Sequence, residues 1–547
     1  MQRILFIFLS FILSLSIYSQ EFGRADSLRG YLFPERSCYD VTYYHLSLNI
    51  NPEKKFIKGF NEIHFTAKDD FSIIQIDLFE NMKINRIEFK KENLDFHRDY
   101  NAVFINFNKE IKKGDKHFIK VFYEGKPRIA VRPPWDGGFS WDKDKNGNHW
   151  IGVSCQGLGA SSWWPNKDHQ SDEPDSMLIS CQVPTGLKCV SNGNLRLHDL
   201  RKSTKYYNTF NWFVSYPINN YDVSLNIADY KHFSDKFISY DGDTLDLDYY
   251  VLKYNEEKAR KQFKQVKPML KCFENIFGKY PFWNDGYALV ETPYLGMEHQ
   301  SAIAYGNEYL RGYKGNTKFT AGFDFDYIII HETGHEWWGN SITSNDISDL
   351  WLHESFCTYS EVLYVECIYG YDSMIKYVTN QMKNTKNIKP IVGIPNVHSE
   401  GSSDMYSKGS SVLHTIRSIV NNDSLWFLTL KSITNNFKHQ TVDGSEVLDY
   451  ISFKTGKNLH HIFKQYLYNA KLPEFQYKLE KRNNNSILKY RWEAIKNFNM
   501  PIKVSLNSKD YFEWIYPSDS WQEIVVNIRL DEFEIAEHLF LIDVKKL

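Results

Sequence analysis

The chain has 547 residues, a length that exceeds one hydrophobic core and favours about two to four domains. Hydrophobic residues make up 42% and charged residues 24% of the sequence, proportions that exclude a disordered chain and indicate a globular one. The formal net charge of −2 gives no sign of a basic surface, so nucleic acid is not expected as a partner.

The first predicted element is a secretory signal peptide at residues 1–19. Arg3 supplies a positive start, an apolar run follows it, and small Ser19 precedes polar Gln20. The alternative is a membrane anchor, but the run is shorter than the ~20 residues that a spanning helix needs. Because no later segment is long and apolar enough to span, we expect a soluble, exported protein without a transmembrane segment, either periplasmic or extracellular.

Segments that alternate between apolar and polar residues come next and predict an antiparallel β domain at residues 20–250. Examples are CYDVTYYHLSLNI, GFNEIHFTA and KHFIKVFYEG. One connecting segment, WDKDKNGNHW, has the spacing that opens an EF-hand calcium loop. Its position 12 is Val153, where a bidentate glutamate is required, so a hairpin turn is the preferred interpretation.

Periodicity then changes from two residues to three or four, in KYNEEKARKQFKQVKPMLKCFENIFG, which predicts an amphipathic helix. The strand YALVE follows, and the chain reads as mostly helical from Asp324 to about Ala470. We assign residues 251–471 to a second domain. Strand patterns such as FQYKLE and PIKVSLN return afterwards and predict a small β-sandwich at residues 472–547.

Seven cysteines are too few and too scattered for a disulfide scaffold. Cys181 and Cys189 flank a turn, which leaves a cross-strand bridge open. Cys357 and Cys367 are expected on one helix about 15 Å apart, too far to bond. Whether any disulfide forms is not fixed by the sequence.

The segment YIIIHETGHEWWGN carries the strongest chemical signal. His331 and His335 are four residues apart, which places both imidazoles on one helix face where they can share a metal, and Glu332 can reach a water on that metal. The alternative is a helix with two hydrogen-bonded histidines. A catalytic zinc takes three protein ligands, and Glu354, in the helical segment DLWLHESFCTYSEVLYVECIYG, can supply the third if the two helices pack together.

HETGHEWWGN combined with DLWLHESFCTYSE resembles the gluzincin aminopeptidases, the family of aminopeptidase N and leukotriene hydrolase. The resemblance covers most of the chain after the signal peptide. It implies a multidomain α+β fold with an N-terminal antiparallel β domain, a thermolysin-like catalytic domain and a small C-terminal β-sandwich. It also implies one Zn²⁺ per chain, held by His331, His335 and Glu354. Asn340 and Asp349 are candidates to orient these ligands, with capping or packing roles as alternatives.

The segment LGMEHQSAIAYGN resembles the family's Gly-x-Met-Glu-Asn motif, with His299 in place of the usual asparagine. The resemblance implies that Glu298 binds the free α-amino group of the substrate. It also implies that the backbone of Gly296 and Met297 forms a strand edge along which a peptide pairs.

Two other segments resemble family motifs of the substrate site. DMYSKGSSVLHTIR resembles Tyr-x-Lys-Gly, which implies that Tyr406 donates a hydrogen bond to the developing oxyanion. VSCQGLGASSWWP resembles the segment that sends a Gln or Glu to the amine site, which implies this role for Gln156.

The resemblance therefore implies a zinc aminopeptidase that hydrolyses the N-terminal residue from peptides by a zinc-activated water, with Glu332 as the base. Three alternatives stay open: a thermolysin-type endopeptidase, which would not need Glu298; an epoxide hydrolase; and a metal-free interaction scaffold. Many relatives carry a further helical domain, and without it we expect a more open cleft or one closed by a partner subunit. The preferred N-terminal residue and the oligomeric state are not fixed by the sequence.

Overall fold

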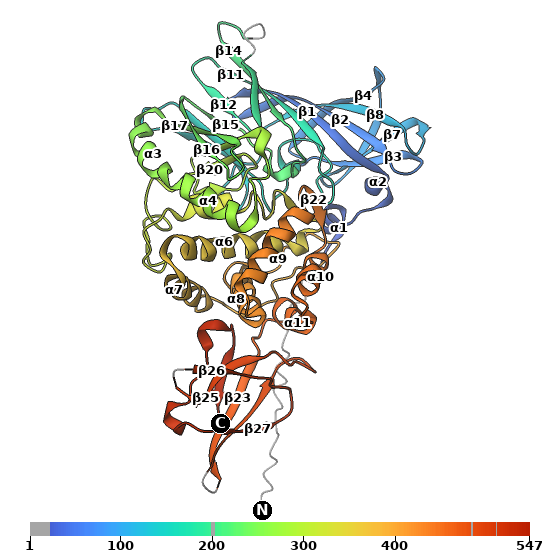
Figure 1. Ribbon diagram of the computed structural model, residues 1–547. Coiled ribbons are helices and arrows are strands. Elements are labelled where there is room, and N and C mark those ends of the chain that lie inside the picture. The colour runs from blue at the N-terminus through green and yellow to red at the C-terminus, as the bar shows by residue number, and fades with distance from the viewer. Residues whose placement is uncertain (1–21, 199–202, 483–484, 510) are drawn as a thin grey trace, which may run out of the picture.

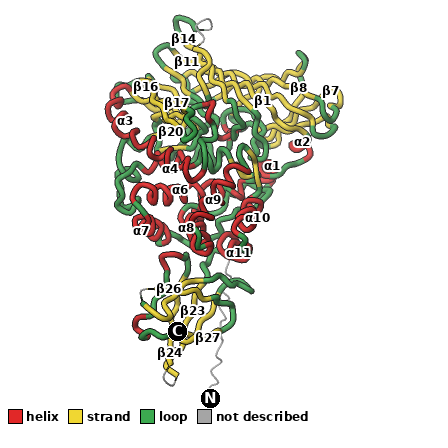
Figure 2. Tube along the Cα trace, viewed as in Figure 1, coloured by secondary structure: helices red, strands yellow, loops and turns green. Residues whose placement is uncertain are grey.

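The computed structural model describes residues 22–198, 203–482, 485–509 and 511–547, so the predicted signal peptide at residues 1–19 lies outside the described residues. Three regions follow one another along the long axis of the molecule: a β-rich domain, a largely helical domain and a small β domain (Figures 1 and 2). The predicted multidomain α+β fold is confirmed. Across the described ranges, every helix is too short or too polar to cross a bilayer.

The N-terminal domain is built on an eight-stranded sheet in the order β13-β14-β11-β1-β2-β8-β4-β5, whose pairs are antiparallel except β1 with β11. Its strands are β1 (Tyr39–Asn51), β2 (Phe56–Ala67), β4 (Met82–Phe89), β5 (Glu92–Asn93), β8 (Lys116–Gly125), β11 (Ser176–Pro184), β13 (Asn194–His198) and β14 (Tyr207–Val214). Alternate residues of the central strands are buried, as the period of two predicts.

Two smaller sheets complete this domain. One contains β3 (Phe71–Asp77), β6 (Asp95–Asp99) and β7 (Ala102–Ile111); the other contains β9 (Gly138–Lys143), β10 (His149–Ser154), β12 (Lys188–Val190) and β15 (Asn226–Ala228). The segment that resembles a calcium loop is the hairpin turn between β9 and β10. Asp144 Oδ1 accepts hydrogen bonds from the N–H groups of Asn146 and Asn148 at 2.9 and 2.8 Å, which confirms the hairpin prediction. Two short helices, α1 (Arg24–Gly30) and α2 (Pro34–Ser37), precede the first strand.

A five-stranded mixed sheet in the order β16-β17-β18-β20-β19 begins the middle domain. Its strands are β16 (Tyr230–Ile238), β17 (Thr244–Leu252), β18 (Tyr287–Glu291), β19 (Gly296–Met297) and β20 (Ala302–Tyr305). The predicted boundary at residue 250 is wrong, because it falls inside this sheet. The period of two is the same in β16 and β17 as in the strands before them, so the pattern alone does not reveal which sheet they join.

Helices cover one side of this sheet and form the middle of the molecule (Figure 1). They are α3 (Glu256–Gln262), α4 (Val266–Phe277), α5 (Tyr327–Gly334), α6 (Trp351–Tyr369), α7 (Tyr371–Met382), α8 (Ser407–Val420), α9 (Asp423–Asn436), α10 (Gly444–Thr455) and α11 (His460–Tyr468), with the short parallel pair β21 (Ile342–Ser344) and β22 (Gln440–Val442) among them. The predicted long helix before YALVE is therefore divided into α3 and α4. Helix α5 packs closely on α6 through Gly334, where an added Cβ would lie 3.0 Å from Cys357 Sγ.

Cys272 of α4 and Cys367 of α6 form a disulfide, with a sequence separation of 95 and their Cα atoms 6.2 Å apart. The spacing of the cysteines did not predict this pairing, because it joins two helices that meet only in the folded domain. Cys181, Cys189 and Cys357 are free and buried, so the cross-strand bridge that the sequence left open is not formed.

The C-terminal domain contains a four-stranded sheet and a two-stranded sheet. The strands are β23 (Glu474–Arg482), β24 (Asn485–Glu493), β27 (Gln522–Val526) and β28 (Asp543–Lys546) in the first, and β25 (Ile502–Ser508) and β26 (Tyr511–Ile515) in the second. Buried Phe475 and Trp492 belong to the same core as the helices of the middle domain, so the C-terminal domain packs directly against it.

Candidate active site

The two histidines of the HExxH segment lie at the end of α5, with their imidazoles 5.0 Å apart and edge to face. Both side chains are buried. The Nδ1 atom of His331 lies 2.7 Å from Glu361 Oε1, and Nδ1 of His335 lies 3.0 Å from the carbonyl oxygen of Trp338. Because each Nδ1 atom has this partner, both Nε2 atoms remain available for a metal.

Glu354, in the first turn of α6, brings a carboxylate to the same point. Its Oε2 atom lies 3.7 Å from His331 Nε2 and 3.4 Å from His335 Nε2. Within the described part of the chain this buried oxygen accepts no hydrogen bond. A buried carboxylate oxygen needs a partner, and two imidazole nitrogens with one carboxylate oxygen match the ligand set of a catalytic zinc. The residues present therefore fit the metal that the sequence predicts.

Two other sets of side chains each bring their possible ligand atoms within 4.8 Å of one another. One set is Cys357 with both histidines, and the other is Glu298 and Glu332 with His335. The Cys357 thiol lies 2.7 Å from the carbonyl oxygen of His331 and donates to it, so it packs α6 against α5. Glu298 already accepts hydrogen bonds from two side chains. These partners favour Glu354 as the third ligand.

Glu361 orients His331 and was not predicted as part of the site. It lies seven residues after Glu354, two turns further along the same face of α6, and this spacing is the signal that could have identified it. The hydroxyl of Tyr377 donates to Glu361 Oε2 at 2.6 Å and fixes the carboxylate.

The two sequence candidates for orienting the ligands, Asn340 and Asp349, lie elsewhere. Asn340 donates to the carbonyl oxygen of Glu298. Asp349 accepts from Trp351 Nε1 and from the N–H group of Gly444. The side chains of both residues therefore hold neighbouring segments in place, and within the described residues neither forms a hydrogen bond with the His331 or His335 ring or with the Glu354 carboxylate.

Glu332 is buried on α5 between the two histidines and faces strand β19. An added Cβ at Gly296 would lie 2.6 Å from Glu332 Oε1, so only glycine leaves room at this point of the strand. Burial raises the pKa of Glu332 to about 8, the charge of Glu298 adds to this increase, and His331 opposes it. A carboxylate with a raised pKa is suited to accept a proton near neutral pH.

Strand β19 lies at the end of its sheet in the order of the described strands, and Gly296 and Met297 pair with β20 on one side. Both residues are buried and line the cavity described below. The edge of β19 that pairs with no described strand therefore offers backbone groups to a peptide, as the sequence predicts.

Glu298 is the centre of a second cluster, at the domain boundary. Its Oε1 atom accepts hydrogen bonds from Gln156 Nε2 at 2.5 Å and from the hydroxyl of Tyr221 at 3.2 Å. The same Gln156 amide lies 3.2 Å from Glu354 Oε1, so it connects the two carboxylates. Burial raises the pKa of Glu298. Tyr221 was missed because nothing in its local sequence separates it from the other tyrosines.

His299, which replaces the usual asparagine, is fully buried. Neither of its ring nitrogens forms a hydrogen bond within the described residues, and burial lowers its pKa to about 3. The ring is therefore neutral, and it is not among the residues that line the cavity.

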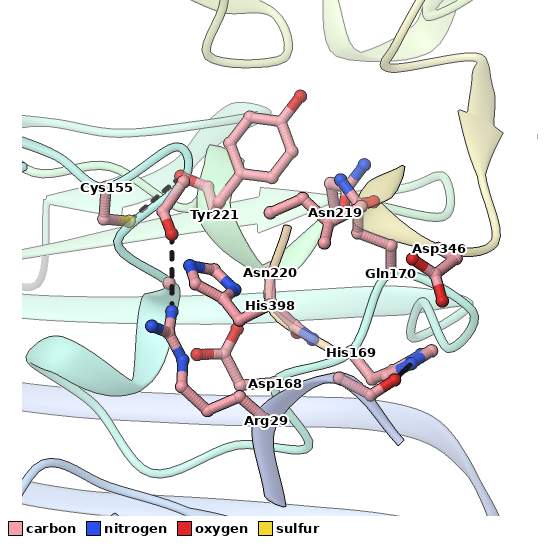
Figure 3. Close-up of a pocket in the computed structure, with 14 residues that line it drawn as sticks. Arg29, Cys155, Asp168, His169, Gln170, Asn219, Asn220, Tyr221, Asp346 and His398 are labelled. Carbon is pink, nitrogen blue, oxygen red and sulfur yellow. Dashed lines mark hydrogen bonds between the residues drawn. The ribbon is translucent and has the colours of Figure 1, made fainter. Parts of the chain in front are cut away.

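Arg29 and Asp168, drawn in Figure 3, hold the turn after Gln156 in place. Arg29 of α1 donates to the carbonyl oxygens of Gly157, at 3.3 Å, and Leu158. Asp168 accepts from the N–H group and the hydroxyl of Ser161, at 3.0 and 2.5 Å. These contacts surround a small cavity of about 60 Å³ and fix the turn that carries the Gln156 amide.

Tyr406 lies directly before α8, with its ring stacked on that of His331 at a centroid distance of 6.1 Å. Burial raises the pKa of its hydroxyl well above the usual value, so it is a neutral donor. Tyr406 shares one cavity of about 980 Å³ with Gln156, Glu298, Glu332 and the cluster of His331, His335 and Glu354. The residues lining that cavity are Arg29, Pro134, Trp135, Asp136, Gln156, Gly157, Leu158, Leu295, Gly296, Met297, Glu298, Tyr313, Phe319, Tyr327, Ile328, His331, Glu332, His335, Leu350, Glu354, His398, Ser399, Glu400, Gly401, Ser403, Met405 and Tyr406.

Comparison with known proteins finds similarity to M1 peptidases and aminopeptidases. Residues 261–466 match the peptidase family M1 domain. A leucyl aminopeptidase of Saccharolobus solfataricus is 21% identical over 495 residues, which are 86% of this chain and 59% of that protein. The tricorn protease-interacting factor F2 of Thermoplasma acidophilum is 23% identical over 270 residues, 47% of this chain and 33% of that protein. The chain thus spans between a third and three fifths of the length of these relatives.

Among solved structures, an M1 zinc metallopeptidase of Deinococcus radiodurans bound to a Tyr-Ser-Ala substrate is similar, with a TM-score of 0.66 and 18% identity over 82% of this chain and 98% of that one. A two-domain M1 zinc metallopeptidase bound to L-tryptophan gives a TM-score of 0.67 at the same identity and the same coverage of both chains. At this level of identity the similarity shows a shared fold.

Proposed function

We propose that this chain, which belongs through its catalytic region to the peptidase M1 family of gluzincin aminopeptidases, is a zinc aminopeptidase that removes the N-terminal residue from peptides. The observation that carries the proposal is the position of Glu298. Its carboxylate lies in the same cavity as the His331, His335 and Glu354 cluster and is held by a neutral amide and a neutral hydroxyl. A buried anion with neutral partners favours binding of an ammonium group.

Binding positions the substrate by its N-terminus. The α-ammonium group pairs with Glu298, and Gln156 holds that carboxylate from the side of the β domain. The peptide backbone lies along β19, beside Gly296, where no side chain stands between it and Glu332. Because the ammonium group is fixed, only the first peptide bond reaches Glu332 and Tyr406.

The chemistry then depends on two side chains that face the first peptide bond. Glu332 accepts a proton from the attacking water and passes it to the leaving amine. Tyr406 donates its hydroxyl to the carbonyl oxygen as negative charge develops there. We propose one Zn²⁺ per chain, held by His331, His335 and Glu354; when bound, it supplies a Lewis acid that lowers the pKa of water and polarises the carbonyl.

We also propose that the protein is exported to the periplasm or beyond. The pattern of residues 1–19 supports this, since it has the charge and apolar run of a signal peptide. The disulfide between Cys272 and Cys367 supports it independently, because disulfides persist in oxidising compartments. N-terminal sequencing of protein recovered from the exported fraction tests the proposal, with a mature N-terminus at Gln20 as the expected result.

Hydrolysis of aminoacyl-p-nitroanilides beside their N-acetylated forms tests the activity, with and without a zinc chelator. We expect hydrolysis of the free-amine compounds only, and loss of that hydrolysis on chelation. Hydrolysis of acetylated substrates would favour an endopeptidase, because an acetylated N-terminus carries no charge for Glu298. A chain that binds no zinc and hydrolyses nothing would favour the interaction scaffold.

A further inference from the structure

Five carboxylates line the large cavity, and four of them, Asp136, Glu298, Glu332 and Glu354, have a clear partner or role. Asp136 accepts hydrogen bonds from the N–H groups of Val131 and Arg132. Glu298 and Glu354 both accept hydrogen bonds from Gln156, and Glu354 also belongs to the proposed zinc ligands. Glu332 is the proposed base.

Glu400 is the fifth of these carboxylates, and neither a partner in the described part of the chain nor a role in the proposed reaction accounts for it. Its side chain is exposed to the cavity and, among the described residues, forms no hydrogen bond or ion pair. Arg29 is the only lysine or arginine among the described residues that line the cavity. Its guanidinium donates to two backbone carbonyl oxygens of the 157–158 turn and lies beside Asp168, so it does not neutralise Glu400.

The position of Glu400 shows which residue of a bound peptide it would face. A Cβ added to Gly157 would lie 3.1 Å from Glu400 Oε2, so this carboxylate stands over Gly157. Gly157 directly follows Gln156, whose amide holds Glu298 at the proposed ammonium site. Glu400 therefore lies beside the place where the N-terminal residue of a substrate would be held.

The walls of the cavity differ in character. Next to Glu400 the wall is polar and includes His398, Ser399 and Ser403. The lining also contains the aromatic and apolar residues Tyr313, Phe319, Tyr327 and Ile328. The lining of the cavity thus offers polar groups around Glu400 as well as apolar surface.

We propose that Glu400 binds the cationic side chain of the substrate's N-terminal residue, so that the chain prefers peptides that begin with arginine or lysine. This inference rests on the proposed aminopeptidase function. A guanidinium or ammonium group that reaches Glu400 forms a charge-assisted hydrogen bond with a carboxylate that has no other partner among the described residues, and arginine can do so with two parallel bonds. A neutral side chain of the same shape leaves the carboxylate unpaired.

Arginine and citrulline p-nitroanilides provide the sharpest test, because citrulline has nearly the same shape and no charge. We expect the intact protein to hydrolyse the arginine compound with a kcat/KM at least about tenfold higher than that for the citrulline compound. In Glu400→Gln the ratio of the two kcat/KM values is expected to fall to near one. Because Glu400 has no partner within the described residues, this variant should fold, and its far-ultraviolet circular dichroism and zinc content verify that.

Asp136→Asn is the matched control, since Asp136 is a carboxylate of the same cavity with its own backbone partners. Its arginine-to-citrulline ratio is expected to stay high. Equal hydrolysis of both compounds by the intact protein would overturn the role of Glu400 while leaving the aminopeptidase function standing. An unchanged ratio in Glu400→Gln would overturn it too. Absence of hydrolysis with zinc bound, for these and for leucine and alanine p-nitroanilides, would instead contradict the proposed function.

Discussion

The side-chain amide of Gln156 lies 2.5 Å from Glu298 Oε1, although 142 residues separate the two in sequence. Gln156 belongs to the turn that follows β10 in the N-terminal domain, and Glu298 follows β19 in the catalytic domain. The proposed ammonium site therefore forms only where these two domains meet. In the proposed function, the packing of the domains determines where a substrate's N-terminus is held.

Replacing Glu298 with glutamine removes the charge that pairs with the ammonium group and keeps the shape. Hydrogen bonds to charged groups contribute roughly 1.5–3 kcal/mol, so we expect kcat/KM for free-amine substrates to fall by about one to two orders of magnitude. The measurement is steady-state hydrolysis of alanine p-nitroanilide. An unchanged kcat/KM in Glu298→Gln would show that this residue does not bind the ammonium group.

Replacing Tyr406 with phenylalanine removes one hydroxyl from the ring that stacks on His331. A lost donor to a developing oxyanion typically lowers kcat by about 10²–10³-fold, whereas KM should change little because the ground-state carbonyl needs the donor less. Steady-state kinetics on the same substrate separates the two constants. A larger effect on KM than on kcat would indicate a binding role instead.

Replacing Glu361 with glutamine is expected to weaken zinc binding. Glu361 lies 2.7 Å from His331 Nδ1, and loss of such a partner typically lowers metal affinity by about 10–100-fold. Competition with a fluorescent zinc chelator measures the affinity. Asp349→Asn is the matched control, because this carboxylate contacts Trp351 and Gly444 and no ligand. Equal affinities in the two variants would contradict an orienting role for Glu361.

The pH dependence should reflect the raised pKa of Glu332. This carboxylate must be ionised to accept a proton, so activity falls as the pH drops through its pKa. Burial raises that pKa from 4.5 to about 8, and a bound dication lowers it again, so we expect the acid limb of kcat/KM between these two values. Zinc content measured at each pH separates this titration from loss of the metal. Activity that is constant down to pH 4.5 with zinc retained would contradict it.

The disulfide between α4 and α6 should stabilise the catalytic domain. Closing a loop with a sequence separation of 95 lowers the conformational entropy of the unfolded chain. Removal of such a bond typically lowers the free energy of unfolding by roughly 2–5 kcal/mol. The variant Cys272→Ser with Cys367→Ser should therefore unfold at a lower denaturant concentration than the intact chain. Thiol titration of unreduced, denatured protein should give five free cysteines, and a count of seven would show that the bond is absent.

The local sequence was sufficient to predict the parts of the site whose residues lie close together in the chain. The spacing of His331 and His335 predicted that both imidazoles lie on one helix face because a helix presents its residues at a fixed period, and the resemblance to the family added Glu354 as the proposed third ligand. The local sequence did not identify Tyr221, since that tyrosine approaches Glu298 only through the packing of two domains.

The same reason explains the missed disulfide between Cys272 and Cys367 and the boundary placed inside the sheet of β16 and β17. Contacts between distant segments leave no local pattern. The pair of histidines could therefore be predicted from spacing, whereas the domain limits and the partners of Glu298 required the folded chain.

Selection of a free N-terminus by Glu298 can be tested by mass spectrometry of the products from a decapeptide and its N-acetylated counterpart. We expect the free peptide to lose one residue at a time from its N-terminus, the acetylated peptide to stay intact, and chelation to stop the reaction. Internal cleavage of both peptides at similar rates would contradict this, because it would show that the Glu298 site does not select a free N-terminus.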